Sequence, residues 1–304
     1  MLNAYSEHMD EILPGENDAR RLAVRQWIAE HPEPSARLLA ESGLVAPHWP
    51  EPYGLGADPV HQLIIDEELS AARIKRPSNQ IGIGWAAPTI IFAGTQEQKD
   101  KYLPDLATGK RRTGIGLTEP DAGTDLQGIR TTARLEGDEY VINGSKTWIT
   151  NARHADPLPV LVKTDPNASP AHKGMSVILI EAGTPGFEIG KDIGKLGYKG
   201  TESCEVILTN VRVPKGNLLG GVEGRGMQQV LSGLETGRVN IAARSVGIAQ
   251  AAYEAAINYS KERKAFGQPI SEFQAIQLKL AEIATNLQAA RLMTYWAASK
   301  ADAG

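Results

Sequence analysis

A turn rich in hydroxyl and carboxyl groups, residues 118–125, directly follows the apolar residues Ile115 and Leu117. Pro120 fixes one backbone angle and Gly123 permits a positive φ, so successive N–H groups of the turn can converge on an acceptor. Such a turn suits a polar ligand that is phosphorylated or heteroaromatic. A capped turn without a ligand is the alternative, and this segment alone does not decide between the two, because short turn motifs recur by chance.

A predicted strand then carries an indole and a hydroxyl group side by side. Asn143 and Gly144 form a turn signal, and strand alternation after it places Trp148 and Thr150 on one face. An indole offers a flat apolar wall, and a hydroxyl can donate to a heteroatom of a ring. An ordinary cross-strand aromatic is the alternative, and these residues alone favour it.

Together, these segments resemble the signatures of the acyl-CoA dehydrogenase family. The resemblance rests on residues 116–125, on Trp148-Ile149-Thr150 and on residues 263–290 (RKAFGQPISEFQAIQLKLAEIATNLQAA), in the family's order. It is loose at the N-terminus and close from about Gly94 onward. It implies α,β-desaturation of an acyl-CoA thioester in fatty acid β-oxidation, with FAD as cofactor and an electron-transfer flavoprotein as the partner that receives the electrons.

The resemblance also assigns residues to the cofactor. Thr118 and neighbouring backbone groups would contact the isoalloxazine ring, while Arg263 would pair with the pyrophosphate of a neighbouring subunit's FAD. Phe266 would pack near the adenosine half of the same neighbouring subunit's FAD. The full set implied for FAD is Ile115, Leu117, Thr118, Gly123, Thr124, Trp148, Ile149, Thr150, Arg263, Phe266 and Gln274. A solvated charge is the alternative for Arg263, and a capping box with Ser271 is the alternative for Gln274.

For the substrate, the resemblance implies Thr124, Glu235 and Arg238, with an ion pair on a helix surface as the alternative for the last two. The reaction needs a carboxylate base for the α-proton. Some branches of the family place that base directly before the Arg at 238, where this chain has Gly237. The other branches place it in a C-terminal segment, so we expect the base glutamate beyond Gly304 and leave the catalytic base unknown.

Two further hypotheses stay open, and Gly237 and the position of the last residue motivate the first of them. The chain could be a non-catalytic or half-site subunit that binds FAD or CoA with a partner, or a flavin oxidase or monooxygenase on the same scaffold. The shared flavin site predicts a homodimer or homotetramer, possibly heteromeric. The two long helices near the end have apolar stripes that need partners, so the chain is either truncated or completed by another subunit.

Three regions are predicted, giving an α+β multidomain fold. Residues 1–112 show mostly helical patterns, among them 20–30, 60–72 and 96–106. Residues 113–219 change to a period of two, with turn signals such as Gly137-Asp138, which predicts an antiparallel β-sandwich or barrel. Residues 220–304 return to helix as an incomplete helical bundle, with an apolar stripe from Phe273 to Ala290.

The composition is that of an ordinary soluble globular protein: 304 residues, 41% hydrophobic, 22% charged and a net charge of −4. The scattered Lys and Arg give no reason to expect nucleic acid binding. The single cysteine, Cys204, fits a reducing compartment, and the absence of a signal peptide or a long apolar run predicts a cytoplasmic protein without membrane insertion. The six histidines form no metal motif.

Overall fold

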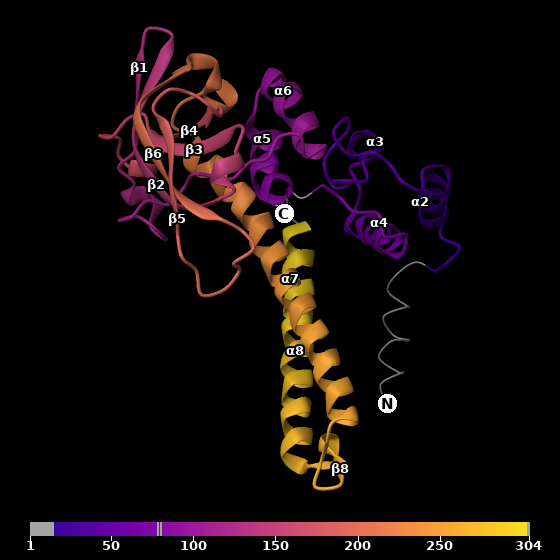
Figure 1. Cartoon of the computed structure of the whole chain (residues 1–304). Coiled ribbons are helices and arrows are strands. Elements are labelled where there is room, and N and C mark those ends of the chain that lie inside the picture. Colours follow the sequence, from indigo (N-terminus) through magenta and orange to yellow (C-terminus); the bar gives the residue numbers. More distant parts are fainter. Residues whose placement is uncertain (1–14, 78, 80, 303–304) are drawn as a thin grey trace. The chain divides into compact units, whose positions relative to one another are not determined.

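The computed structural model describes residues 15–77, 79 and 81–302 (Figure 1). The chain divides into two compact units, Met1–Val230 and Leu231–Gly304. The first unit contains a helical region followed by a β-sheet region, and the second consists of two long helices and a short hairpin. The predicted α+β order of helices, sheet and helices is confirmed.

The helical region of the first unit has helices whose first turns are capped by side chains. Asp18, Ser35, Asp58 and Thr95 each accept a hydrogen bond from a backbone amide of the following helix, as expected for N-cap residues. The helices are α2 (Ala19–Glu30), α3 (Ala36–Glu41), α4 (Pro59–Ala71), the π-helix η1 (Gly82–Ala86), α5 (Ala87–Ala93) and α6 (Gln96–Ala107). Val24, Leu39, Leu44, Val45, Ile65 and Leu69 form their buried core.

The β region is a six-stranded sheet in the order β4-β3-β1-β2-β6-β5. Its strands are β1 (Thr132–Glu136), β2 (Glu139–Thr150), β3 (Leu158–Lys163), β4 (Met175–Ile180), β5 (Phe187–Asp192) and β6 (Ser203–Pro214). All neighbouring pairs are antiparallel except β1 and β3, which pair in parallel. Short 3-10 helices precede the first strand (Leu126–Gly128), lie between strands (Ala152–His154 and Ala171–Gly174) and follow the last strand (Lys215–Asn217 and Leu219–Gly221).

The predicted turn at Gly137 and Asp138 is confirmed as the connection between β1 and β2, but the turn predicted at Asn143 and Gly144 is wrong. β2 runs straight through these two residues, and the register against β6 is irregular there. A side chain at Gly144 would place its Cβ 2.4 Å from the Thr131 hydroxyl oxygen. The glycine is therefore explained by a close backbone approach inside the sheet.

One glutamine of α6 joins the helical region to the sheet region within the first unit. The side chain of Gln98 is buried and donates to the carbonyls of Gly216 and Leu218, both at 2.8 Å. Its carbonyl oxygen accepts from the amides of Thr95 and Gly220, at 3.0 and 3.1 Å. All four hydrogen-bonding positions of the amide are thus filled.

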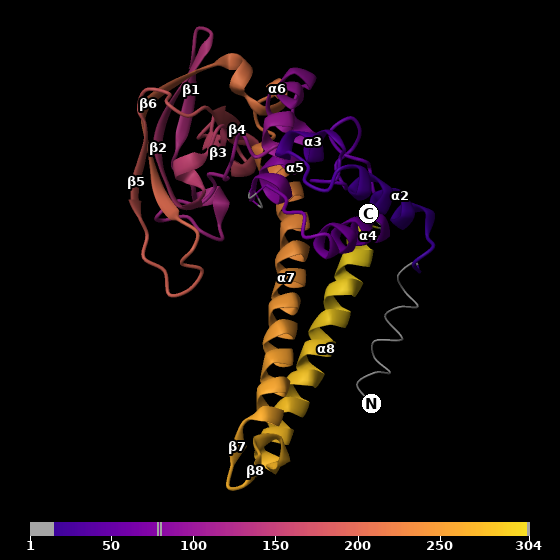
Figure 2. The ribbon, with the colours of Figure 1, turned by 45° about the vertical axis from the view of Figure 1, so that its right-hand side comes forward.

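In the second unit, α8 (Gln274–Asp302) lies beside the long helix α7 (Gly226–Glu262), which begins in the first unit (Figure 2). The two helices are joined by the hairpin of β7 (Lys264–Ala265) and β8 (Gln268–Pro269) and by the 3-10 helix η7 (Ile270–Glu272). Arg291 of α8 donates to the side chain of Gln250 in α7 at 2.7 Å. Of the predicted apolar stripe, Leu287 is buried, but Ile283 remains 42% exposed.

No helix among the described residues is both long enough and apolar enough to cross a lipid bilayer. The same residues contain no group of three or more His, Cys, Asp or Glu side chains arranged to hold a metal ion.

Candidate functional site

The segment that carries Ile115, Leu117 and Thr118 is held between two strands. Gly116 bonds to β3 through its amide and its carbonyl, at 2.8 and 2.9 Å from Pro159 and Leu161. On the other side, the Thr118 hydroxyl donates to the Thr147 carbonyl at 2.6 Å, and the Thr147 amide returns a bond to the Thr118 carbonyl. The start of the turn is therefore fixed to the sheet on both edges.

A buried ion pair that was not predicted from the sequence anchors the turn to β2. Lys146 of β2 has no exposed surface, and its ammonium lies 2.8 Å from a carboxylate oxygen of Glu119 and 3.0 Å from the Leu117 carbonyl. Glu119 also accepts from the Thr131 hydroxyl at 2.6 Å and from the Arg130 amide at 2.6 Å. Both carboxylate oxygens are thus satisfied, as a buried charge requires.

The environment of this pair shifts both pKa values downward. Burial lowers the pKa of Lys146 to about 8, although the hydrogen bond with Glu119 acts in the opposite direction. Burial acts to raise the pKa of Glu119, but hydrogen bonds from Lys146 and Thr131 outweigh it, so that pKa lies below its usual value. Both groups are therefore charged at neutral pH, and the turn is tied to β2 by an ion pair.

Trp148 lies in a β-bulge. Lys146 pairs with Val206 and Ile149 with Cys204, so Thr147 and Trp148 together oppose one residue of β6. Trp148 has φ 61°, an unusual value for a residue with a large side chain, and its side chain is 55% exposed. The bulge therefore turns the indole outward directly beside the hydroxyl-rich turn.

Thr150 ends β2 next to the bulge and is half-buried, whereas Ile149 between it and Trp148 is buried. The Thr150 hydroxyl lies 3.2 Å from the hydroxyl of Ser203 in β6. The predicted proximity of Trp148 and Thr150 on the accessible side of β2 agrees with this burial pattern. Its cause is the bulge, and not the regular alternation that the sequence suggested.

The outer part of the turn differs from the expectation at Gly123. Its φ is not positive, and a Cβ at this position would meet no other atom within 4 Å. The turn is instead closed by reciprocal backbone bonds between Glu119 and Ala122, at 2.9 and 3.1 Å. Gly123 and Thr124 are both exposed, so this part of the turn presents open surface.

The residues assigned to a neighbouring subunit's FAD lie around the hairpin of the second unit. Phe266 and Gly267 form its two-residue turn, both with positive φ, as in a type I′ hairpin. The Phe266 side chain is 97% exposed, and Arg263 is also exposed. Gln274 is the first residue of α8 and follows the 3-10 turn that holds Ser271, so the predicted capping box is wrong.

Of the residues assigned to the substrate, Thr124 lies in the first unit, and Glu235 and Arg238 lie early in the second unit, on α7. Arg238 is exposed and Gly237 is buried. The side chain of Glu235 lies outside the described residues.

The geometry of the first unit fits a flat heterocyclic cofactor. Within the described part of the chain, the amides of Leu117 and Thr118 donate to no protein acceptor. Thr118 is hydrogen-bonded to Thr147, the neighbour of the outward-facing Trp148, so these donors and the indole offer polar contacts for the edge of a ring and an apolar wall for its face. FAD, whose ring system has both features, matches this set of groups.

Models of three successive domains of one family match almost the entire chain. The N-terminal, middle and C-terminal domains of acyl-CoA dehydrogenase match residues 12–110, 114–211 and 224–304. The chain belongs to the acyl-CoA dehydrogenase family. It is an oxidoreductase of this FAD-dependent family.

Relatives in the family include dehydrogenases and reductases. The probable acyl-CoA dehydrogenase YngJ of Bacillus subtilis is 42% identical over 271 residues, which cover 88% of this chain and 71% of the relative. The 3-(aryl)acrylate reductase of Clostridium sporogenes is 40% identical, covering 91% of this chain and 73% of the relative.

Solved structures of the family have the same fold. Acyl-CoA dehydrogenase from Geobacillus kaustophilus is 35% identical, with a TM-score of 0.77 over 94% of this chain and 80% of that chain. A chain from a structure of the electron transferring flavoprotein of Acidaminococcus fermentans is 36% identical, with a TM-score of 0.78 over 96% and 81%. Glutaryl-CoA dehydrogenase of Mycobacterium smegmatis in complex with FADH2 is 29% identical, with a TM-score of 0.77 over 97% and 78%.

Proposed function

We propose that this chain is an FAD-dependent acyl-CoA dehydrogenase that introduces an α,β double bond into an acyl-CoA thioester and passes the electrons to an electron-transfer flavoprotein. The observation that carries the proposal is the turn 115–125, fixed by the Lys146–Glu119 pair beside the exposed Trp148 and the Thr150 hydroxyl. The match to a chain from an electron-transferring flavoprotein structure supports the choice of electron acceptor.

The residues that would hold the ring lie in the first unit. The free amides of Leu117 and Thr118 and the hydroxyl of Thr150 would donate hydrogen bonds to its edge, and Trp148 would cover one face and exclude water. Bound FAD would supply the two-electron acceptor that desaturation requires. Ile115, Gly123, Thr124 and Ile149 complete the proposed first-unit set.

A second copy of the chain would contribute Arg263, Phe266 and Gln274 to each FAD, which makes a homodimer or homotetramer the proposed assembly. Arg263 precedes the two-stranded hairpin and Phe266 lies in its turn, and because both are exposed they are available to an adjacent subunit. An Arg guanidinium suits a pyrophosphate because its N–H groups match two oxygens at once.

For the acyl-CoA substrate, we propose contacts from Thr124, Glu235 and Arg238. Gly237 carries no side chain that could remove a proton, so we assign the catalytic base to no residue of this sequence. The proposed domain boundaries remain 1–112, 113–219 and 220–304.

An anaerobic titration tests the proposed function. The purified protein should be yellow, and adding saturated acyl-CoA without oxygen should bleach the flavin absorption near its long-wavelength maximum. Protein that takes up no FAD, or a bound flavin that no acyl-CoA of short, medium, long or branched chain reduces, would contradict the proposal. Rapid peroxide release when the reduced protein meets air would indicate an oxidase instead.

The reverse reaction, reduction of an α,β-unsaturated acyl group, is a second candidate. It is favoured by the 3-(aryl)acrylate reductase among the relatives at 40% identity. Reoxidation of chemically reduced flavin by an enoyl-CoA or an arylacrylate, at a higher rate than bleaching by the saturated compound, would support this direction.

A further inference from the structure

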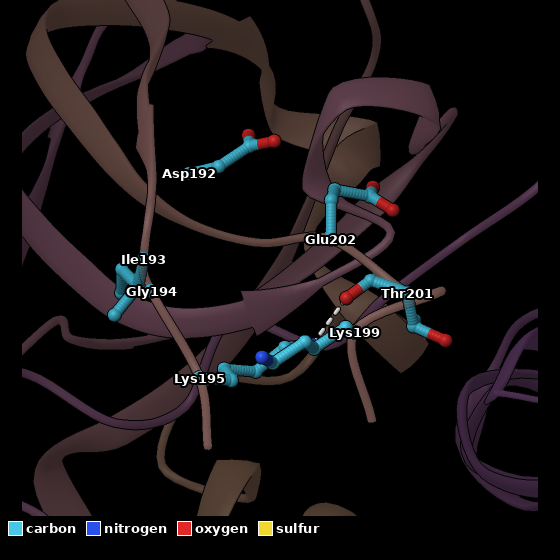
Figure 3. Close-up of a pocket in the computed structure, with 7 residues that line it drawn as sticks. All are labelled: Asp192, Ile193, Gly194, Lys195, Lys199, Thr201 and Glu202. Carbon is cyan, nitrogen blue, oxygen red and sulfur yellow. Dashed lines mark hydrogen bonds between the residues drawn. The ribbon is translucent and has the colours of Figure 1, made fainter. Parts of the chain in front are cut away.

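The loop between β5 and β6 forms a pocket that no part of the proposed function uses (Figure 3). Two lysines line this pocket, Lys195 and Lys199, together with Thr201 and Glu202. Lys199 is exposed, but Lys195 is half-buried and its ammonium donates to the Thr201 carbonyl, the bond drawn as a dashed line in Figure 3. The two lysines are therefore in different environments within one loop.

Lys195 is also the first member of a row of hydrogen-bonded side chains that reaches β2. Its ammonium donates to the hydroxyl oxygen of Ser203 at 3.2 Å, and that oxygen lies 3.2 Å from the hydroxyl oxygen of Thr150. Ser203 is only 5% exposed and is the register partner of Thr150 across β2 and β6. The contact between Ser203 and Thr150 is thus built into the pairing of these strands.

The ammonium group decides the direction of the hydrogen bonds in this row. A lysine ammonium can only donate, so the Ser203 oxygen must accept from it. Within the described part of the chain, the only acceptor in reach of the Ser203 proton is the Thr150 oxygen. When Ser203 donates to Thr150, the proton of the Thr150 hydroxyl remains available for another acceptor.

We propose that Lys195 is a positioning residue that, through Ser203, sets the Thr150 hydroxyl as a hydrogen-bond donor toward the flavin ring. This inference rests on the proposed function, because it needs FAD beside Thr150. Oxidised flavin offers ring nitrogen and carbonyl acceptors along its edge. A preset donor avoids the loss of rotational freedom that a free hydroxyl would undergo on binding, so it should favour binding of the oxidised cofactor.

The test measures the affinity of the apoprotein for oxidised FAD and the visible spectrum of the bound flavin. Lys195→Met should weaken FAD binding up to about tenfold, because the Ser203 oxygen can then accept from Thr150, and the hydrogen bond from Thr150 to the flavin is lost. Thr150→Val should cause a similar loss and a similar change in the flavin spectrum. Lys199→Met, which removes the same charge from the same loop, is the matched control and should change the dissociation constant by less than about twofold.

The decisive measurement is a double-mutant cycle. In the Thr150→Val background, adding Lys195→Met should weaken binding by less than about twofold, because the donor through which Lys195 acts is already gone. Additive effects, or equal effects of Lys195→Met and Lys199→Met, would overturn the inference. Lys195→Arg keeps a charged donor and should restore most of the affinity.

Should Lys195→Met fail to fold, Ser203→Ala breaks the same row without removing the charge. It should weaken FAD binding by less than Thr150→Val, because the Thr150 hydroxyl remains but is no longer oriented, and an affinity equal to that of the unsubstituted protein would overturn the inference. If the unsubstituted protein binds no FAD at all, both the proposed function and this inference fail. If it binds FAD and only the substitutions have no effect, the inference fails alone.

Discussion

The Lys146–Glu119 pair buries two opposite charges beneath the turn. A buried ion pair often adds little net stability, because removing two charges from water costs several kcal/mol per ion. Its role here is to fix geometry. The Glu119 carboxylate connects the turn to Arg130 and Thr131, and the Lys146 ammonium connects β2 to Leu117. The pair therefore fixes the conformation of the turn that we propose to bind the flavin.

Breaking this pair should destabilise the protein strongly. Glu119→Gln leaves the Lys146 ammonium buried without a counter-charge, and we expect a loss of about 3 kcal/mol in the free energy of unfolding at pH 7. Urea denaturation measures it. Glu139→Gln, at an exposed carboxylate of the same strand β2, is the control and should change stability by less than about 0.5 kcal/mol.

The Lys146–Glu119 pair also makes the free energy of unfolding depend on pH in the acidic range. Because the pKa of Glu119 is lower in the folded protein than its ordinary value of 4.5, its contribution to stability is present above that pH and is lost as the pH falls through the folded pKa. The difference between the parent protein and Glu119→Gln should therefore shrink as the pH falls below about 4. A difference that stays constant down to pH 3 would contradict this assignment.

At the bulge in β2, glycine should be more stabilising than alanine, which is the reverse of their order in a regular strand. Trp148 has a φ of 61°, which only glycine adopts without strain. Trp148→Gly should therefore be about 1 kcal/mol more stable than Trp148→Ala in urea denaturation. At the exposed Arg134 of β1, where the backbone is regular, the glycine variant should be less stable than the alanine variant, by about 0.5–1 kcal/mol.

The sequence pattern locates strand β2 but does not reveal the bulge within it. The segments around Trp148 and Gly137 were recognisable from alternation and turn residues. Strict alternation places Lys146, Trp148 and Thr150 on one face, yet the bulge buries the lysine and exposes the indole. A bulge depends on the pairing partner, β6, which lies some 60 residues further along the chain. The Lys146–Glu119 pair and the course of β2 through Gly144 also depend on residues distant in sequence, Glu119 and Thr131, which a local pattern does not reveal.

The junction of α6 with the sheet region depends on one side chain. Gln98→Ala removes the partner of the Gly216 carbonyl and of the half-buried Gly220 amide, while the Leu218 carbonyl keeps its bond from the Gly221 amide. We expect a loss of about 2 kcal/mol in the free energy of unfolding, because the buried Gln98 side chain makes several hydrogen bonds and each contributes about 0.5–1.5 kcal/mol. Gln96→Ala, at an exposed position of the same helix, is the matched control. Equal stability of the two variants would contradict the role of Gln98.

The second unit exposes many large apolar side chains for a pair of helices. Ile248 on α7 and Leu278, Leu292 and Met293 on α8 are each between 58% and 71% exposed. Helices that expose apolar side chains in this way are suited to pack against further helices. The helix pair therefore supports the proposed assembly from several copies, in which the FAD site would combine residues of two chains.

A mixing experiment tests this shared site. Arg263→Ala removes the proposed contribution to a neighbour's FAD, while Trp148→Ala removes a contribution to the chain's own FAD. In either pure variant every site carries one lesion. In a mixed symmetric dimer one site carries both lesions and the other carries none, so random reassembly of equal amounts should restore about a quarter of the FAD sites of the parent protein.

Flavin binding at a fixed low FAD concentration, before and after the two variants are unfolded together and refolded, measures this recovery. Mixing without unfolding is the control and should give only the average of the two variants. If joint refolding also gives no more than that average, then Arg263 and Trp148 serve the same FAD within one chain, or Arg263 serves none. Recovery above the average requires that one intact site be built from two chains, because neither variant can supply all of its residues.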